Sequence, residues 1–410
     1  MGGEWRTSCW GDEVTLEYGK AIRGYSQSQG KYRVFGSNGP IGWTTDALTQ
    51  GPGVVLGRKG AYRGVEFCRE PFWVIDTAYY LRPKTDFDMR WLYYAVKHYR
   101  LGEVDDGSPI PSTTRSAVYM LDLDVPPKHE QKKVSNILGT LDDKIELNRK
   151  QNETLEAMTR AIFKAWFVDF EPVRAKMEGR WQRGQSLPGL PADLYDLFPD
   201  RLVETELGEV PVGWDELSLD AIAKYTNGLA LQKYPAESDD EFLPVIKIAQ
   251  LRAGNADGAD RASARIGPEY VVDDGDVLFS WSGSLEVEVW CGGRGALNQH
   301  LFKVTSNTVP KWFYFFATRQ HLHDFRAIAA GKATTMGHIQ RKHLTDARVV
   351  VPPSGALEKF DAEIGPLFHM TISNALQSRT LTHLRNTLLP KLISGELRIP
   401  DAERIVGAAA

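Results

Sequence analysis

The sequence predicts an α/β (α+β) chain in which two α/β globular units form an internal repeat and are separated by two long coiled-coil helices. Three observations lead to this prediction: an internal repeat, a heptad pattern in each copy, and strand-like runs between the heptads. The length of 410 residues suits two or three domains. With 42% hydrophobic and 25% charged residues the composition is that of a globular protein, which excludes a disordered, collagen-like or membrane-embedded chain.

The internal repeat has an offset of 226 residues, at which Pro126-Pro127 matches Pro352-Pro353 and Asn148 matches Asn374. Upstream of the helices the offset shrinks, as changes in loop length would cause. We therefore expect a globular unit followed by a helix, twice. The same offset of 226 pairs Lys133 with Lys359, Leu141 with Leu367, Thr154 with Thr380, and Arg115 with Arg341.

Each helical segment begins after a Pro-Pro pair and carries apolar residues at alternating spacings of three and four, which is typical of a coiled-coil seam. Both seams are polar in the middle, at Asn148 and Asn374, and seam asparagines fix the register of paired helices. Two unrelated amphipathic helices would not be expected to share this interruption. The predicted seam residues are Leu138, Leu141, Ile145, Asn148, Leu155, Ile162, Ile364, Leu367, Asn374, Leu381 and Leu388.

The globular units contain short apolar runs with turn residues between them, which indicates strands, and aromatic segments that indicate short helices. The predicted strands are 53–57, 73–81, 276–279 and 300–304, and the predicted helices are 91–99 and 312–319. The predicted boundaries are 1–127 and 214–353 for the globular units, 128–180 and 354–398 for the long helices, 181–213 for an acidic linker and 399–410 for a tail.

Other classes of protein are disfavoured by what the sequence lacks. The cysteines Cys9, Cys68 and Cys291 are odd in number and far apart, so we expect no disulfide framework and a cytoplasmic location. The N-terminus does not resemble a signal peptide, and no apolar run is long enough for a membrane span. We find no phosphate-binding loop, no dinucleotide fingerprint, and no histidine or cysteine spacing typical of a metal site. We therefore predict no catalytic residues and no metal site.

The formal net charge of −4 hides an uneven distribution. Residues 289–345 hold eight basic residues and one acidic residue, whereas 214–288 hold six basic and fifteen acidic ones. Any single charge could pair with a neighbour inside the unit. The basic cluster as a whole, however, favours an anionic partner such as nucleic acid. Outside 181–213 the basic and acidic residues balance. The whole net charge of −4 therefore comes from 181–213, which holds two basic and six acidic residues.

Two globular units held apart by a helix of about 60 Å suggest a protein that contacts double-stranded DNA at two half-sites. Because the units differ in sequence, the half-sites should differ too. The candidate DNA contacts are basic or hydrogen-bonding side chains. They are Arg58, Lys59, Arg63, Thr113 and Arg115 in the first unit, and Lys332, His338, Gln340, Arg341 and Lys342 in the second.

Several segments resemble a known family. Residues 125–131, 141–145 and 163–173 resemble the central conserved region of type I restriction–modification specificity subunits, and 388–397 resembles their distal conserved region. The chain departs from the pattern after Pro353, where the Glu-Gln that follows the first Pro-Pro pair is missing.

The resemblance implies two target-recognition domains in a pseudo-twofold repeat, which contact a split asymmetric DNA site and are joined by an antiparallel pair of coiled-coil helices. It also implies that the helices dock two methyltransferase subunits, to which restriction/translocase subunits can add. It implies a non-catalytic chain, with S-adenosylmethionine, ATP and Mg²⁺ serving the partners and no cofactor bound here. The alternative is a coiled-coil adaptor whose globular ends bind proteins. Steep weakening of binding by salt would favour DNA over that alternative.

Overall fold

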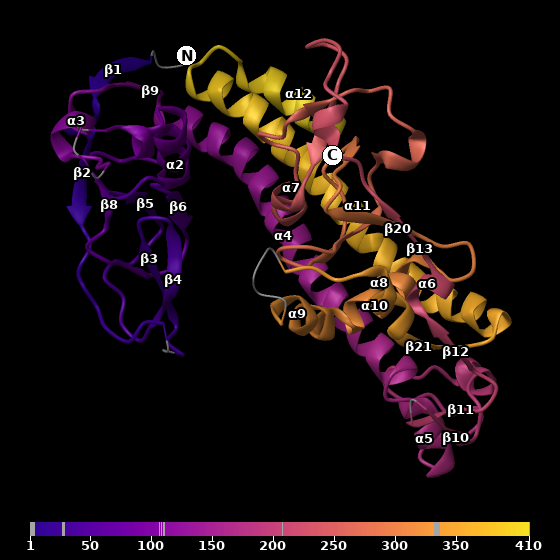
Figure 1. The fold of residues 1–410 in the computed structure, drawn as a ribbon. Helices are drawn as coiled ribbons and strands as arrows, with labels where there is room; N and C mark the ends of the chain where they lie inside the picture. The colour runs from indigo at the N-terminus through magenta and orange to yellow at the C-terminus, as the bar shows by residue number, and fades with distance from the viewer. Residues whose placement is uncertain are drawn as a thin grey trace. The chain divides into compact units, whose positions relative to one another are not determined.

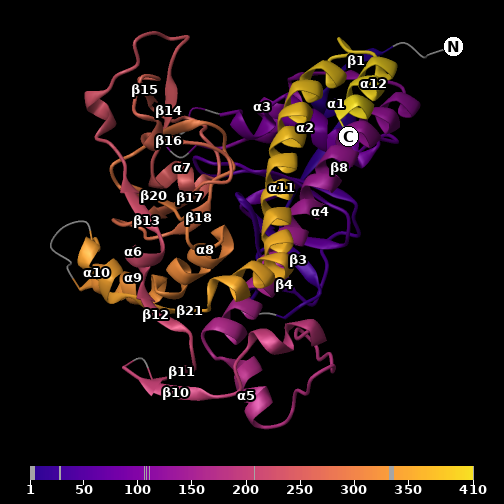
Figure 2. The same cartoon turned by 90° about the vertical axis from the view of Figure 1, so that its right-hand side faces the viewer.

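The computed structural model describes residues 5–26, 29–105, 107, 109, 111–206, 208–331 and 337–409 (Figures 1 and 2). The chain forms two compact units, the first made of Met1–Ile145 with Thr380–Ala410 and the second of Glu146–Arg379. Two long helices, α4 (Lys128–Phe167) and α11 (Ser354–Ile393), each contribute one part to either unit. The predicted α/β fold with two long packed helices is confirmed.

The first unit is built around an antiparallel sheet of strand order β2-β8-β5-β6. Helix α2 (Met89–His98) packs against β5 and β6, and the Asp88 side chain caps it by accepting hydrogen bonds from the backbone N–H groups of Arg90 and Trp91. A sheet of order β4-β3-β7 and the antiparallel pair β1-β9 complete the strands. The strands are β1 (Arg6–Cys9), β2 (Val14–Tyr18), β3 (Tyr32–Gly36), β4 (Gly39–Thr44), β5 (Gly53–Gly57), β6 (Val65–Cys68), β7 (Phe72–Val74), β8 (Ala78–Pro83) and β9 (Asp122–Val125). The other helices are α1 (Trp10–Glu13), η1 (Leu101–Glu103), α3 (Arg115–Tyr119) and α12 (Ile399–Ala409).

The second unit repeats this plan with an antiparallel sheet of order β13-β20-β17-β18, the pair β12-β21 and the helix α8 (Lys311–Gln320). Its second sheet has the order β15-β14-β19-β16. The repeat in the sequence is therefore also a repeat of strand order. The strands are β12 (Asp215–Ser218), β13 (Lys224–Asn227), β14 (Leu243–Ile246), β15 (Arg261–Ala262), β16 (Val271–Val272), β17 (Val277–Ser280), β18 (Val287–Val289), β19 (Gly295–Leu297), β20 (Leu301–Thr305) and β21 (Arg348–Val351). The shorter helices are α6 (Leu219–Ile222), η3 (Leu231–Lys233), α7 (Ile248–Ala253), η4 (Pro268–Tyr270), α9 (Leu322–Ala330) and α10 (Arg341–Asp346).

Two details of the predicted elements are corrected by the structure. The run 73–81 is not one strand, because a turn closed by the hydrogen bond from the Ala78 N–H to the Ile75 carbonyl separates β7 from β8. The predicted tail at 399–410 contains helix α12, whose Ala402 is fully buried in the core of the first unit. Burial of its apolar face explains why this segment is helical.

The acidic segment 181–213 is folded rather than an open linker. It contains the turn η2 (Ala192–Leu197) and the hairpin of β10 (Leu202–Thr205) and β11 (Gly208–Pro211), which follow helix α5 (Glu171–Met177) (Figure 1). Its aromatic residues explain the difference, since Trp181 and Phe198 are buried in the core of the second unit. Their apolar surface outweighs the acidic, Gly- and Pro-rich character of the segment.

In the second unit, α4 and α11 run antiparallel and meet at a hydrogen-bonded polar layer. The Asn148 Nδ2 atom donates to Gln377 Oε1 at 2.9 Å, and the Asn374 Nδ2 atom donates to Asn152 Oδ1 at 3.0 Å. Asn152 in turn donates to the Thr371 carbonyl at 2.8 Å. The polar middle of each predicted seam thus lies where the two helices exchange side-chain hydrogen bonds, an arrangement that fixes their register.

Burial along the predicted seam is uneven. Leu138, Leu141, Asn148, Ile364, Leu381 and Leu388 are buried, whereas Ile145, Leu155, Ile162, Leu367 and Asn374 are half-buried. The largest apolar side chains on the two helices, such as Phe163, Phe167 and Phe360, pack instead with the globular core of the second unit. The helices therefore form part of each core as well as contacting one another.

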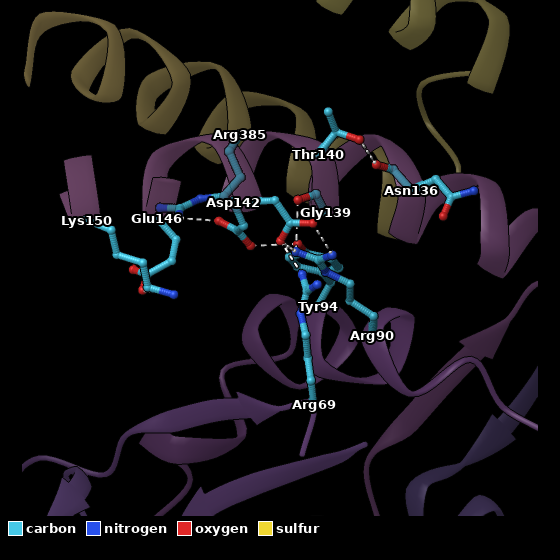
Figure 3. A network of polar contacts seen from close by, with 11 residues as sticks. Arg69, Arg90, Tyr94, Asn136, Gly139, Thr140, Asp142, Glu146, Lys150 and Arg385 are labelled. Carbon is cyan, nitrogen blue, oxygen red and sulfur yellow. Dashed lines mark hydrogen bonds and ion pairs between the residues drawn. The ribbon is translucent and has the colours of Figure 1, made fainter. Parts of the chain in front are cut away.

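In the first unit, two neighbouring aspartates fasten α4 to its surroundings (Figure 3). Asp142 accepts hydrogen bonds from Arg385 of α11 at 2.7 Å and from the Tyr94 hydroxyl of α2 at 2.6 Å. Asp143 accepts from Arg90 of α2 at 2.6 Å and from Arg69, which follows β6. Through these contacts α4 is joined both to the other long helix and to the sheet-covering helix of its own unit.

The pKa of Asp143 predicts how the first unit responds to acid. The hydrogen bond from Arg90 is the largest cause lowering this pKa to about 2, whereas an aspartate in an unfolded chain has a pKa of about 3.9. Because the folded pKa is the lower one, the stabilisation is complete above about pH 4 and is lost as the pH falls towards 2. We expect acidification from about pH 5 to about pH 2.5 to lower the urea midpoint more steeply in the wild type than in Asp143→Asn. Equal slopes in the two proteins would contradict this role.

Candidate nucleic-acid interface

The strand registers of the two units identify equivalent positions. Tyr18 ends β2 and lies opposite Tyr79 of β8, just as Asn227 ends β13 and lies opposite Phe302 of β20. The residue that directly follows the third strand of the sheet is Arg58 after β5 in the first unit and Trp281 after β17 in the second. Arg115 and Arg341, the first residues of α3 and α10, are also equivalent.

In the first unit these positions form a cluster of two arginines on two tyrosines. The Arg115 guanidinium carbon lies 4.1 Å from the ring centre of Tyr18 and 5.9 Å from that of Tyr79. The Arg58 guanidinium carbon lies 5.0 Å from the Tyr18 ring centre. Stacking on a ring fixes the plane of a guanidinium and leaves the donors at its edge available for hydrogen bonds. We call Tyr18, Arg58, Tyr79 and Arg115 the first cluster.

The electrostatics of the first cluster are unusual for a protein surface. Neither Arg58 nor Arg115 forms an ion pair within the described ranges, and the Nε atom of each is buried without a hydrogen-bond partner there. A hydrogen bond from Tyr79, helped by the charges of Arg115 and Arg58, lowers the pKa of the Tyr18 hydroxyl. Burial raises the pKa of Tyr79 to about 12. Two neighbouring cations that lack a carboxylate favour an external acceptor or anion.

In the second unit the equivalent positions form a cluster with different side chains. The Arg341 guanidinium carbon lies 5.5 Å from the ring centre of Phe302, and its Nη2 donates to the Tyr225 carbonyl at 3.2 Å. The Trp281 Nε1 atom donates to Asn227 Oδ1 at 3.0 Å, and its ring centre lies 5.9 Å from that of Phe302. We call Asn227, Trp281, Phe302 and Arg341 the second cluster.

The two clusters share one element and differ in the rest. In both units an arginine at the start of a short helix lies over the aromatic ring of the second strand, Tyr79 or Phe302. The other two positions hold Tyr18 and Arg58 in one unit and an asparagine and a tryptophan in the other. Two related domains that bind different DNA sequences would need a common positioning residue, here the arginine, beside side chains that differ between the domains.

Two of the predicted DNA contacts in the first unit are used internally. Thr113 is fully buried, and its hydroxyl donates to the Val104 carbonyl at 3.0 Å. The backbone N–H of Thr113 donates to the Arg58 carbonyl, and that of Ile339 donates to the Trp281 carbonyl, so Ile339 is the equivalent residue in the second unit. Ile339 is buried as well. The Arg63 guanidinium donates to the carbonyls of Gly102 at 2.6 Å and Gly60 at 3.1 Å. We therefore remove both from the candidate set.

The remaining candidates lie near the clusters in sequence. Lys59 is exposed, and its backbone forms a bridge with Ser112 that matches the bridge between Ser282 and His338 in the second unit. The His338 ring meets that of Trp281 edge to face at 6.3 Å. Gln340 precedes α10 and exchanges hydrogen bonds with His343 as a capping box, and Lys342 is exposed. Lys332 lies outside the described residues.

The basic run 289–345 does not form one continuous basic face. The Lys303 Nζ atom lies 2.9 Å from Asp276, and Arg326 lies 2.9 Å from Glu286, so these charges pair with acids of the preceding acidic segment. The opposite charges of the two segments therefore neutralise one another at several places. Arg341, in contrast, has no ion pair within the described ranges.

The aromatic members of the clusters were not among the sequence-based candidates. Tyr18, Tyr79 and Phe302 lie in strands, where an aromatic residue is ordinarily a packing residue. Alignment of the repeats by strand register, rather than by a constant offset, is the signal that could have found them. Within the described ranges no group of histidine, cysteine and carboxylate side chains is placed to hold a metal ion, and no helix is long and apolar enough to cross a membrane.

Two α/β units of one strand order, each with an arginine–aromatic cluster, define a two-domain binding protein. Residues 4–157 match the family model of the type I restriction modification DNA specificity domain. The chain is 25% identical over 331 residues to the type I restriction enzyme MjaIX specificity subunit of Methanocaldococcus jannaschii, covering 78% of this chain and 71% of that protein. It is 26% identical over 335 residues to the HindI specificity subunit of Haemophilus influenzae, covering 70% and 71%.

The fold is similar to that of a solved structure. The crystal structure of the type I restriction–modification system S subunit from M. genitalium superposes with a TM-score of 0.60 over 95% of this chain and 96% of that chain, at 15% identity. The chain is therefore similar in sequence to type I restriction enzyme specificity subunits over most of its length, and its first 157 residues contain the match to their DNA specificity domain.

Proposed function

We propose that this chain is the DNA-specificity subunit of a type I restriction–modification complex and contacts a bipartite asymmetric site, one half with each unit. The observation that carries the proposal is the pair of clusters, which occupy the same place in two units of one strand order and hold different side chains. Arginines without carboxylate partners suit DNA, since Arg contacts phosphates and the guanine edge.

The similarity to type I restriction enzyme specificity subunits supports a role in assembly as well as in recognition. In our proposal the long helices dock two methyltransferase subunits, and restriction/translocase subunits join that complex. Catalysis belongs to those partners, which bind S-adenosylmethionine, ATP and Mg²⁺, and this chain binds no cofactor of its own. Such a complex acts on DNA in the cytoplasm.

The test is methylation by the assembled complex. The chain is produced together with its methyltransferase partner in cells free of other modification, and genomic DNA is sequenced by a single-molecule method that detects methylated bases. We expect one recurring methylated motif made of two different halves separated by a fixed spacer. Genomic DNA without any recurring methylated motif would refute the function.

Substitution of Arg341 distinguishes DNA recognition from the adaptor function. We expect Arg341→Ala to weaken DNA binding by the assembled complex and to reduce the slope of log affinity against log salt by about one, because one phosphate contact is lost. The measurement is fluorescence anisotropy of labelled DNA across a salt series. The matched control is Arg261→Ala, which removes an exposed arginine that pairs with Asp239 in the same unit.

The control should bind DNA as the wild type does and show the same salt slope. If Arg341→Ala also has the wild-type slope, Arg341 does not contact DNA. Absence of any salt dependence in the wild-type complex would favour the adaptor.

A further inference from the structure

The first cluster contains two donors that lack a partner inside the protein. The Nε atoms of Arg58 and Arg115 are both buried without an acceptor in the described part of the chain, and a buried donor left unpaired is costly. Both guanidiniums lie against the ring of Tyr18, which is 45% exposed and so places the cluster at the surface. Because these Nε atoms are buried, a ligand would meet the Nη donors of the guanidiniums, which lie in one plane and suit a ligand with acceptors in one plane.

Among the bases of DNA, guanine presents that pattern. Its O6 and N7 atoms are neighbouring acceptors in the major groove, and a bidentate contact with arginine is the commonest base-specific contact. A phosphate also offers acceptors to arginine. A phosphate contact, however, carries no information about the DNA sequence. The position of Arg58 holds Trp281 in the second unit, and such a difference between the units suits a contact with a base rather than a phosphate.

The second cluster cannot make the same contact. Trp281 stands at the position of Arg58, and its indole has a single N–H donor, which the Asn227 side chain already accepts. The Nδ2 donors of the exposed Asn227 and the face of Trp281 remain for other base features. In the first unit, Arg58 therefore offers two donors in one plane. In the second unit, the equivalent place holds the Asn227 amide beside the aromatic face of Trp281.

We propose that Arg58, held on Tyr18, contacts a guanine of the first half-site, and that Trp281 with Asn227 sets a different base preference at the equivalent place of the second half-site. Arg115 and Arg341 are the shared positioning contacts, because each lies over the equivalent strand aromatic. This inference rests on the proposed function and assigns the residues that make the two half-sites differ.

The experiment compares methylated motifs of complexes that carry single substitutions. The substitutions in the first cluster are Arg58→Ala and Arg58→Lys, and Trp281→Ala is the substitution in the second. Arg82→Ala is the matched control, because Arg82 lies on β8, the strand that holds Tyr79, is 69% exposed and pairs with Glu17. Each complex is produced with its methyltransferase partner, and methylated genomic motifs are read as for the wild type.

With Arg58→Ala we expect one guanine position in one half of the motif to become degenerate, with discrimination there falling on the order of 10-fold to 100-fold. Arg58→Lys keeps the charge but loses the bidentate geometry, so it should relax the same position partially. Trp281→Ala should alter only the other half, and Arg82→Ala should leave the motif unchanged.

Three outcomes would overturn the inference. One is an unchanged motif with Arg58→Ala, and another is uniformly weaker methylation with no relaxed position, which marks a phosphate contact. The third is a relaxed position that is not guanine. If Arg58→Ala abolishes methylation completely, Arg58→Lys decides the question. With Arg58→Lys, the motif must still be methylated and must become degenerate at a single guanine position. A wild-type complex that methylates no recurring motif would instead refute the proposed function itself.

Discussion

Phe360→Ala is expected to lower the free energy of unfolding by roughly 3–5 kcal/mol, the usual cost of removing a buried aromatic ring. Phe360 is fully buried, and its ring centre lies 4.9 Å from that of Phe198 and 5.5 Å from those of Trp166 and Phe167. These rings come from both long helices and from the folded acidic segment. Truncation would therefore leave a cavity where three segments of the second unit meet.

Urea unfolding followed by tryptophan fluorescence measures this loss, since Trp166 lies in the affected cluster. The matched control is Met370→Ala on the same helix, where the side chain is 50% exposed and the expected change is within about 0.5 kcal/mol. A loss below about 1 kcal/mol for Phe360→Ala would show that the acidic segment and the helices do not share one core.

Asp142→Ala is expected to destabilise the first unit by about 3 kcal/mol, the lower end of the cost of breaking a buried ion pair. The change leaves the Arg385 guanidinium and the Tyr94 hydroxyl without their acceptor in a place where the arginine side chain is only 19% exposed (Figure 3). Both long helices and α2 lose a common contact. Thermal unfolding of the purified chain measures the effect as a lower Tm of the first unit.

Arg69→Ala is the control for this network. Arg69 contacts the neighbouring Asp143, but its side chain is 57% exposed, and exposed ion pairs contribute at most about 1 kcal/mol. Asp142→Asn, which keeps the shape and one acceptor oxygen, should fall between the two. Similar losses for Asp142→Ala and Arg69→Ala would show that burial does not distinguish the two aspartates.

The long helices could be predicted because their apolar residues recur over many turns, so that single irregular residues do not hide the period. The break between β7 and β8 was not predicted, because residues 73–81 are strand-like except for Asp76-Thr77, and the different pairing partners of β7 and β8 show that the chain turns there. The folded acidic segment was missed for a related reason. Its composition is that of a loop, and the burial of Trp181 and Phe198 depends on partners far away in the sequence.

The candidate site could be predicted in part. Arg58, Arg115 and Arg341 were selected from basic, acid-poor segments, and the structure places them on the aromatic rings of the clusters. Arg63 and Thr113 have the same local composition, but their side chains donate to backbone carbonyls inside the unit. Sequence does not show whether a polar side chain of a loop points towards solvent or back into the fold.

The division of the chain has a consequence for the order in which the protein acquires structure during synthesis. The second unit is one continuous segment, Glu146–Arg379, whereas the first also needs Thr380–Ala410. The core of the first unit unites Leu138 and Leu141 with Leu388 and Leu392. Domains ordinarily fold from the N-terminus as the ribosome releases them. Here the unit that is synthesised first is the last to be completed, because its core also includes residues of α11 and Ala402 of α12.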